Sequence, residues 1–145
     1  MDKSNDGENM MHEWVKQGYC VGFATSRGVL LDLDNMTLKK AKWIAKTLLD
    51  EFKLEGFILI RSSANNYHAV FNKYVSWKTI TQVLFSRFEC VRYAVQQMQN
   101  GHLALRISPK NGKNKPKILI ETGKTDKLIT DYLEVFKKFQ KVKDV

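Results

Sequence analysis

Two carboxylates, Asp32 and Asp34, are the side chains of this sequence best placed by type and spacing to do chemistry. They flank Leu33 and follow the apolar run Gly28–Leu31. Successive side chains of a strand point to opposite faces, so the two aspartates share one face while the leucines enter a core. Two like charges held this close repel, and a divalent cation with bound phosphates offsets that repulsion. The spacing therefore indicates a metal site; the alternative is a solvated strand end before a helix.

A serine-rich turn leading to a histidine is the second candidate. Ser62 and Ser63 follow an apolar run, and His68 stands among strand-forming residues shortly after them. Hydroxyls and turn amides can hold phosphate oxygens, and a neighbouring histidine can donate to a β- or γ-phosphate. This segment predicts a phosphate-binding turn, and the alternative is a tight hairpin with its histidine on the exposed face.

Arg106 is the third candidate, together with the basic loop that follows it. An arginine inside the apolar run Leu103–Ile107 costs stability unless its planar guanidinium has an anionic partner, such as a phosphate or a carboxylate. The loop beyond is suited to a nucleic-acid backbone or a triphosphate, or else is simply solvated. Its lysines are Lys110, Lys113, Lys115 and Lys117.

Strand-forming segments carry each of these candidates. Tyr19–Thr25 and Val29–Leu33 are separated by a short turn and predict a hairpin. Phe57–Arg61 and Tyr67–Phe71 predict a second hairpin, because Ser, Ala and Asn between them favour a turn. Two more strands are expected on either side of the basic loop, at Leu103–Ile107 and Lys117–Ile120.

Apolar residues at helical spacing predict the remaining elements. One amphipathic helix runs from Thr37 to near Gly56, and helices capped by Ser76 and Thr125 begin further along, the former followed by another helical stretch. The order ββαββα(α)ββα predicts an α+β fold, with a mostly antiparallel sheet and helices packed on one side. Trp43 and Trp77 are expected to pack against that sheet.

Length and composition fit one folded domain. The chain has 145 residues, 43% of them hydrophobic, and we expect a flexible N-terminus over residues 1–12 before a single domain over 13–145. The formal charge of +9 favours polyanionic partners. Cys20 and Cys90 lack the spacing of a metal finger, and no apolar run reaches the roughly 20 residues that span a bilayer. These features predict a reduced cytoplasmic protein without a membrane partner.

The order of the three candidates resembles the archaeo-eukaryotic primase superfamily, which includes primase small subunits and plasmid primase-polymerases. Its acidic motif is matched by Asp32-Leu33-Asp34, its serine turn ending in histidine by Ser62–His68, and its arginine strand by Leu105–Pro109. The resemblance covers roughly residues 19 to 122. It implies a palm-like fold similar to an RNA-recognition motif, and a nucleotidyltransferase that synthesises primers in DNA replication.

The resemblance also assigns roles to residues. Asp32, Asp34 and His68 would be catalytic, with the aspartates holding Mg²⁺ or Mn²⁺ for phosphoryl transfer. Nucleotide binding would fall to Arg61, Ser63, His68 and Arg106, and nucleic-acid binding to Lys110, Lys113, Lys115 and Lys117. The implied partners are nucleoside triphosphates, a single-stranded DNA or RNA template and a replication partner subunit.

One feature departs from the family pattern. Where a third carboxylate usually precedes the arginine strand, this chain has Asn100, Gly101 and His102. Asn100 is a weak, neutral ligand, and His102 is softer than Mg²⁺ prefers, while Glu121 could supply the charge from a neighbouring strand.

Three functions therefore stay open from the sequence. The chain is a catalytic primase-like domain, a non-catalytic relative that binds nucleotide or single strands, or a module like an RNA-recognition motif that stacks bases on exposed aromatics. The side chains on the open face of the sheet distinguish them. The acidic residues with His68 and Arg106 favour a nucleotide site, whereas the aromatics Tyr19, Phe23, Tyr67 and Phe71 would favour stacking.

Overall fold

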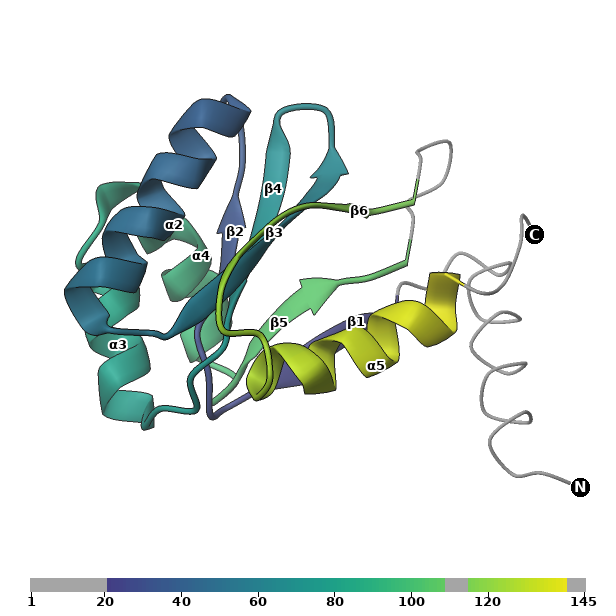
Figure 1. Cartoon of the computed structure of the whole chain (residues 1–145). Coiled ribbons are helices and arrows are strands. Elements are labelled where there is room, and N and C mark those ends of the chain that lie inside the picture. The colour runs from purple at the N-terminus through teal and green to yellow at the C-terminus, as the bar shows by residue number, and fades with distance from the viewer. Residues whose placement is uncertain (1–20, 109–114, 141–145) are drawn as a thin grey trace, which may run out of the picture.

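The computed structural model describes residues 21–108 and 115–140 (Figure 1). Six strands and four helices in these residues follow one another in the predicted order. The strands are β1 (Gly22–Thr25), β2 (Leu30–Leu33), β3 (Gly56–Ser63), β4 (Asn66–Phe71), β5 (Leu103–Arg106) and β6 (Lys117–Gly123). The helices are α2 (Leu38–Phe52), α3 (Trp77–Phe85), α4 (Phe88–Met98) and α5 (Leu128–Gln140). Predictions for the N-terminal 1–12 segment, Tyr19, Cys20, Lys110 and Lys113 lie outside the described residues.

The α+β class is confirmed, and the strands form two antiparallel sheets. Four strands pair in the order β2-β4-β3-β6, and β1 pairs with β5 in a separate two-stranded sheet. The predicted hairpin of β3 with β4 is confirmed, and Asn65 in its turn takes a left-handed backbone conformation with φ of +60°. This hairpin brings the serine turn and His68 together.

The predicted hairpin of β1 with β2 is wrong. β2 pairs with β4 instead, and β1 crosses to β5. The segment expected to turn, at Gly28, lies beneath α5, where an added Cβ would come within 1.8 Å of Leu128 Cδ1. Gly22 also approaches β5 closely, since a Cβ there would lie 2.7 Å from the carbonyl oxygen of Leu105. Long-range packing therefore overrides a local turn whose residues alone favour a hairpin.

Two helices begin where their capping residues predict. Thr37 accepts a hydrogen bond from the backbone N–H of Lys40 at the start of α2, and Ser76 accepts one from Thr79 at the start of α3. The apolar face of α2 then enters the core through Ala41, Ile44, Ala45 and Leu48. None of the helices in the described residues is long and apolar enough to cross a membrane.

Helices flank the four-stranded sheet on both sides (Figure 1), so the expectation of helices on one side only is wrong. Figure 1 shows α2 and α5 on opposite sides of the four-stranded sheet. The residues Phe57–Ile60 of β3 and Tyr67–Phe71 of β4 are all buried, so both faces of these central strands are covered. On the α5 side, the ring of Tyr132 meets the ring of Phe23 edge-on at 5.4 Å. Continuous apolar strands need this double covering.

Asn72 caps α5 from the end of β4. Its side chain is fully buried, and its Oδ1 accepts a hydrogen bond from the N–H of Lys127 at 2.8 Å. Its Nδ2 donates to Asp126 at 3.1 Å, and this bond holds the pKa of the Asp126 carboxyl below its usual value. Thr125, which the sequence suggests as the cap, instead accepts a hydrogen bond from Thr130 through its carbonyl oxygen.

Candidate functional site

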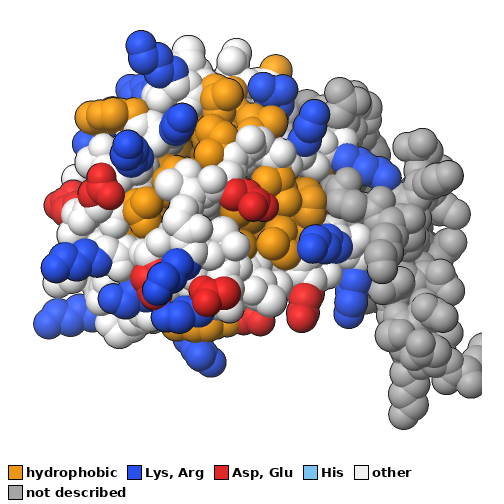
Figure 2. All heavy atoms as spheres, viewed as in Figure 1, with side chains coloured by type: hydrophobic (Ala, Val, Ile, Leu, Met, Phe, Trp, Pro, Cys, Tyr) orange, Lys and Arg blue, Asp and Glu red, His pale blue; other side chains and the backbone are white. Residues whose placement is uncertain are grey.

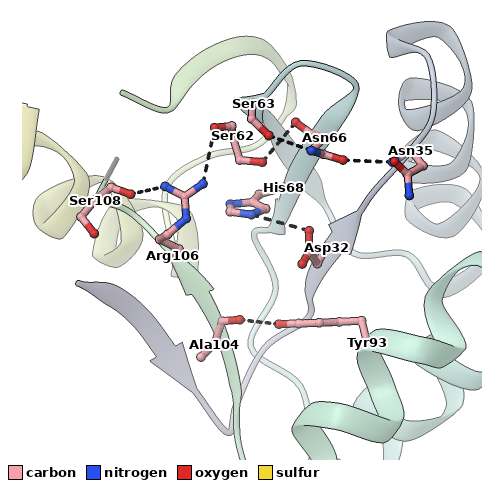
Figure 3. Close-up of polar contacts among 10 residues, drawn as sticks. All are labelled: Asp32, Asn35, Ser62, Ser63, Asn66, His68, Tyr93, Ala104, Arg106 and Ser108. Atoms are coloured by element: carbon pink, nitrogen blue, oxygen red, sulfur yellow. Dashed lines mark hydrogen bonds and ion pairs between the residues drawn. The ribbon is translucent and has the colours of Figure 1, made fainter. Parts of the chain in front are cut away.

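A pocket of about 430 Å³ lies where β2, the β3–β4 hairpin, α4 and β5 meet. It brings together residues from all three sequence candidates, and Figure 3 shows several of them pointing toward one another. The predicted residues that line it are Asp32, Asp34, Ser62, Ser63, His68 and Arg106. Another wall is formed by Tyr93, Gln96 and Gln97 of α4, which the sequence does not predict because these residues carry no motif and only the fold brings them there.

Asp32 and His68 form the centre of the pocket. They are directly opposite each other in the β2–β4 ladder, and His68 Nε2 lies 3.7 Å from Asp32 Oδ1. The imidazole is buried, whereas a third of the Asp32 side chain is exposed. The alternative of a histidine on an exposed hairpin face is therefore wrong. The carboxylate can orient the ring.

Asn66 joins the loop that carries Asp34 to the serine turn (Figure 3). Its Oδ1 accepts from the N–H of Asn35 at 3.0 Å, and its Nδ2 donates to Ser63 Oγ at 2.7 Å. Asn35 has a left-handed backbone with φ of +56°, which asparagine tolerates better than most residues. These bonds hold the loop after β2 against the hairpin, so the carboxylates and the serine hydroxyls keep a fixed relation.

Arg106 reaches from β5 to the four-stranded sheet. Its guanidinium donates to the carbonyl oxygen of Ser62 at 3.5 Å and to that of Ser108 (Figure 3). The sequence predicts an anionic partner for this arginine, and the structure gives it carbonyl partners in addition to a place in the pocket wall. A cation held in this way raises the local concentration of phosphate-bearing ligands.

Tyr93 closes the α4 side of the pocket. Its hydroxyl donates to the carbonyl oxygen of Ala104 at 2.8 Å. Burial raises the pKa of the phenol, and the Asp32 carboxylate raises it further. Tyr93 therefore stays neutral at physiological pH and presents no charge to a ligand.

Several predicted residues lie away from this pocket. Arg61 and Lys117 are exposed and directly paired across β3 and β6. Asn100 is exposed beyond the end of α4, and Lys115 is partly buried outside the pocket lining. Glu121 lies on β6, the edge strand farthest from β2, and pairs there with Ile58 of β3. Three strand spacings separate those edges, or roughly 14 Å, so Glu121 does not supply a charge beside Asp32.

The donor set of the pocket can hold one hard cation together with a ligand. Within residues 21–108 and 115–140, no group of three or more His, Cys, Asp or Glu side chains is arranged to hold a metal. Mg²⁺ in nucleotide sites is commonly held by one or two carboxylates, with waters and substrate phosphates completing its shell. Asp32 and Asp34, both in the pocket lining, fit that requirement.

The aromatic residues that would favour base stacking are not on the open face. Tyr67 and Phe71 are buried in the core, and Phe23 packs against Tyr132. Tyr19 lies outside the described residues. The pocket is instead lined mostly by charged and polar side chains, together with Tyr93, Ala104 and Leu105. In comparisons with protein-family models, curated proteins and solved structures, nothing matches this chain.

Proposed function

We propose that this chain is a primase-like nucleotidyltransferase domain of the archaeo-eukaryotic primase type, acting in the cytoplasm in DNA replication. It would bind a metal-nucleotide and a single-stranded DNA or RNA template for primer synthesis, with a replication partner subunit. The observation that carries the proposal is the convergence of Asp32, Asp34, His68 and Arg106 on one pocket. These residues come from separate strands and loops, and they are the residue types that the resemblance requires at such a site.

The pocket offers complementary groups to a triphosphate. Arg106 supplies a fixed positive charge, and the Ser63 hydroxyl, which accepts from Asn66 Nδ2, can donate its own proton to a phosphate oxygen. The Ser62 hydroxyl already donates to the carbonyl oxygen of Asn66. His68, oriented by Asp32, would donate to a phosphate oxygen and stabilise charge that develops on the leaving group. The chain's own groups would thus bind the phosphates beside the carboxylates, since His68 Nε2 lies 3.7 Å from Asp32 Oδ1.

Asp32 and Asp34 would hold Mg²⁺ or Mn²⁺. When bound, such an ion supplies Lewis-acid chemistry, neutralising phosphate charge and lowering the pKa of an attacking hydroxyl. Without a cation, the two carboxylates would repel the triphosphate that Arg106 attracts. We therefore expect nucleotide binding to depend on a divalent ion.

A second candidate function is nucleotide binding without transfer, in an accessory subunit. It is favoured by the position of Glu121 on the distant edge strand, since no third carboxylate among the described residues joins the aspartates. Two-metal transfer relies on several acidic ligands, whereas binding of one metal-nucleotide needs fewer. The two functions share the pocket and differ in turnover.

Template-dependent incorporation of labelled nucleotides with Mg²⁺ or Mn²⁺ tests the proposal. The variant Asp32→Asn/Asp34→Asn should lose incorporation, by at least about a hundredfold, because it removes the cation ligands. The matched control is Asp50→Asn/Glu51→Gln, which removes two exposed carboxylates at the far end of α2 and should retain full activity.

Calorimetry of nucleotide binding separates the two functions. Metal-dependent binding without incorporation would assign the accessory function. Binding that is unchanged in Asp32→Asn/Asp34→Asn would reject the pocket as the nucleotide site.

A further inference from the structure

The outer face of α2 carries a tryptophan among lysines. Trp43 is 55% exposed, so the expectation that it packs against the sheet is wrong. Lys39, Lys42 and Lys46 are also exposed and follow one another at helical spacing around it. We call Lys39, Lys42, Trp43 and Lys46 the α2 stripe. It lies opposite the buried face of the helix and outside the pocket lining.

The α2 stripe has an excess of positive charge, with three lysines against the one exposed carboxylate, Asp50, that follows Lys46 by one helical turn. Lys39, Lys42 and Lys46 form no ion pair with any residue that the structure describes. The neighbouring Glu89 is already paired, with Arg87 at 3.0 Å and Lys40 at 3.7 Å. Figure 2 shows Lys and Arg side chains gathered with hydrophobic ones over the α2 side of the molecule, at upper left.

Trp43 is held in place although it is exposed. The guanidinium carbon of Arg87, at the junction of α3 and α4, lies 4.7 Å from the centroid of the indole ring. This cation–π contact fixes the ring, while the charge of Arg87 is itself paired with Glu89. Phe88, the next residue along the chain, is 92% exposed and offers a second aromatic ring near Arg87.

We infer that the α2 stripe binds single-stranded nucleic acid, at a surface separate from the pocket. Lysines that track a phosphate backbone, with aromatic rings on which bases stack, are the two elements of single-strand binding without sequence preference. A protein partner that buried this face would have to desolvate the three lysines, whereas phosphates neutralise them and release counterions. The charge therefore favours a polyanion over an apolar partner.

Binding of a fluorescein-labelled oligodeoxythymidylate of about 15 nucleotides, followed by anisotropy over a salt series, tests this inference. Lys39→Gln/Lys42→Gln/Lys46→Gln should weaken binding and reduce the slope of log K against log salt by about 2. Trp43→Ala should weaken binding roughly tenfold or more with little change in that slope. The matched control, Lys78→Gln/Lys137→Gln/Lys138→Gln, removes three exposed lysines on α3 and α5 and should lower the affinity less.

Two further measurements make the outcome decisive. Quenching of tryptophan fluorescence by the oligonucleotide should be lost in Trp43→Ala and retained in Trp77→Phe, because Trp77 packs against the core outside the α2 stripe. Equal affinity and salt slope in wild type and the triple lysine variant would overturn the inference. A dimer in sedimentation that Trp43→Ala dissociates, with oligonucleotide affinity unchanged, would overturn it in favour of a contact between two copies of the chain.

Discussion

Arg106 illustrates how one side chain can join two sheets and serve the pocket between them. Its guanidinium links β5 to the carbonyl oxygen of Ser62 on β3, and it also donates to the carbonyl oxygen of Ser108. Two acceptors in different segments require the planar, multiply donating group of arginine. A lysine at this position keeps the charge but has no fork with which to bridge both carbonyls.

We therefore expect Arg106→Lys to lower the free energy of unfolding by about 1–3 kcal/mol, because hydrogen bonds from a charged donor are lost. Nucleotide affinity should fall about tenfold with it, since the cation is no longer held at the pocket wall. Urea unfolding and calorimetry measure the two effects. Arg92→Lys, at an exposed position on α4, is the matched control. An Arg106→Lys protein with wild-type stability would contradict a bridging role.

Residue types were enough to identify the centre of the candidate site but not its boundary. Asp32, His68 and Arg106 could be selected from their types and neighbours. A carboxylate pair, a histidine after a serine turn and an arginine in an apolar strand each lower stability unless they have a partner, so each suggests a binding role. Arg61 and Glu121 could not be excluded, because their faces depend on the register of β3. That register shifts between Arg61 and Ser63 and again between Leu59 and Ile60. Such bulges break strict alternation and are not visible in the sequence.

Asn66 acts between elements, since it ties the loop after β2 to the β3–β4 hairpin. Its two side-chain hydrogen bonds, to Asn35 and Ser63, are joined by a backbone bond from the N–H of Met36 to the carbonyl oxygen of Asn65 at 3.0 Å. The side chain therefore positions the Asp34 loop without itself carrying charge. Residue type alone does not distinguish Asn66 from the other turn-forming residues around it.

Asn66→Ala should weaken metal-nucleotide binding about fivefold to thirtyfold, because the loss of two bonds frees the Asp34 loop. The free energy of unfolding should fall by only about 1 kcal/mol, since the turn is near the surface. The divalent-ion concentration needed for half-maximal binding should rise as well, which a purely structural role would not produce. Asn100→Ala, at an exposed turn, is the control. Unchanged metal dependence would show that the loop is held by its backbone alone.

At the scale of elements, the order of strands and helices follows from local patterns, whereas strand partners do not. The helix starts at Thr37 and Ser76 were predictable because capping is a local interaction. The crossing of β1 to β5 depends on contacts between residues far apart in sequence, such as Gly22 with Leu105. The pocket exists because of that crossing, which places Arg106 opposite the hairpin.

At the scale of the whole molecule, the core contains several ionisable groups that burial keeps neutral. Burial raises the pKa of the Cys90 thiol to about 12. It also raises the pKa values of the Tyr93 and Tyr132 phenols, with the Asp32 carboxylate contributing at Tyr93. All three residues belong to the hydrophobic core, so ionising any of them requires the packed structure to open.

This arrangement predicts alkaline unfolding. In the unfolded chain the thiol ionises near pH 9 and the phenols near pH 10, below their values in the folded protein. The unfolded state therefore loses protons first, and the free energy of unfolding should fall as the pH rises above about 9. Urea unfolding from about pH 7 to about pH 11 measures this fall, and tyrosinate absorbance should show a late fraction that appears only with unfolding. In Cys90→Ala the cavity lowers stability at every pH, but the decline that begins near pH 9 should be shallower, because one buried acid is gone. Equal pH slopes in the two proteins would mean that Cys90 ionises without unfolding, and that the core around α4 opens more readily than its burial implies.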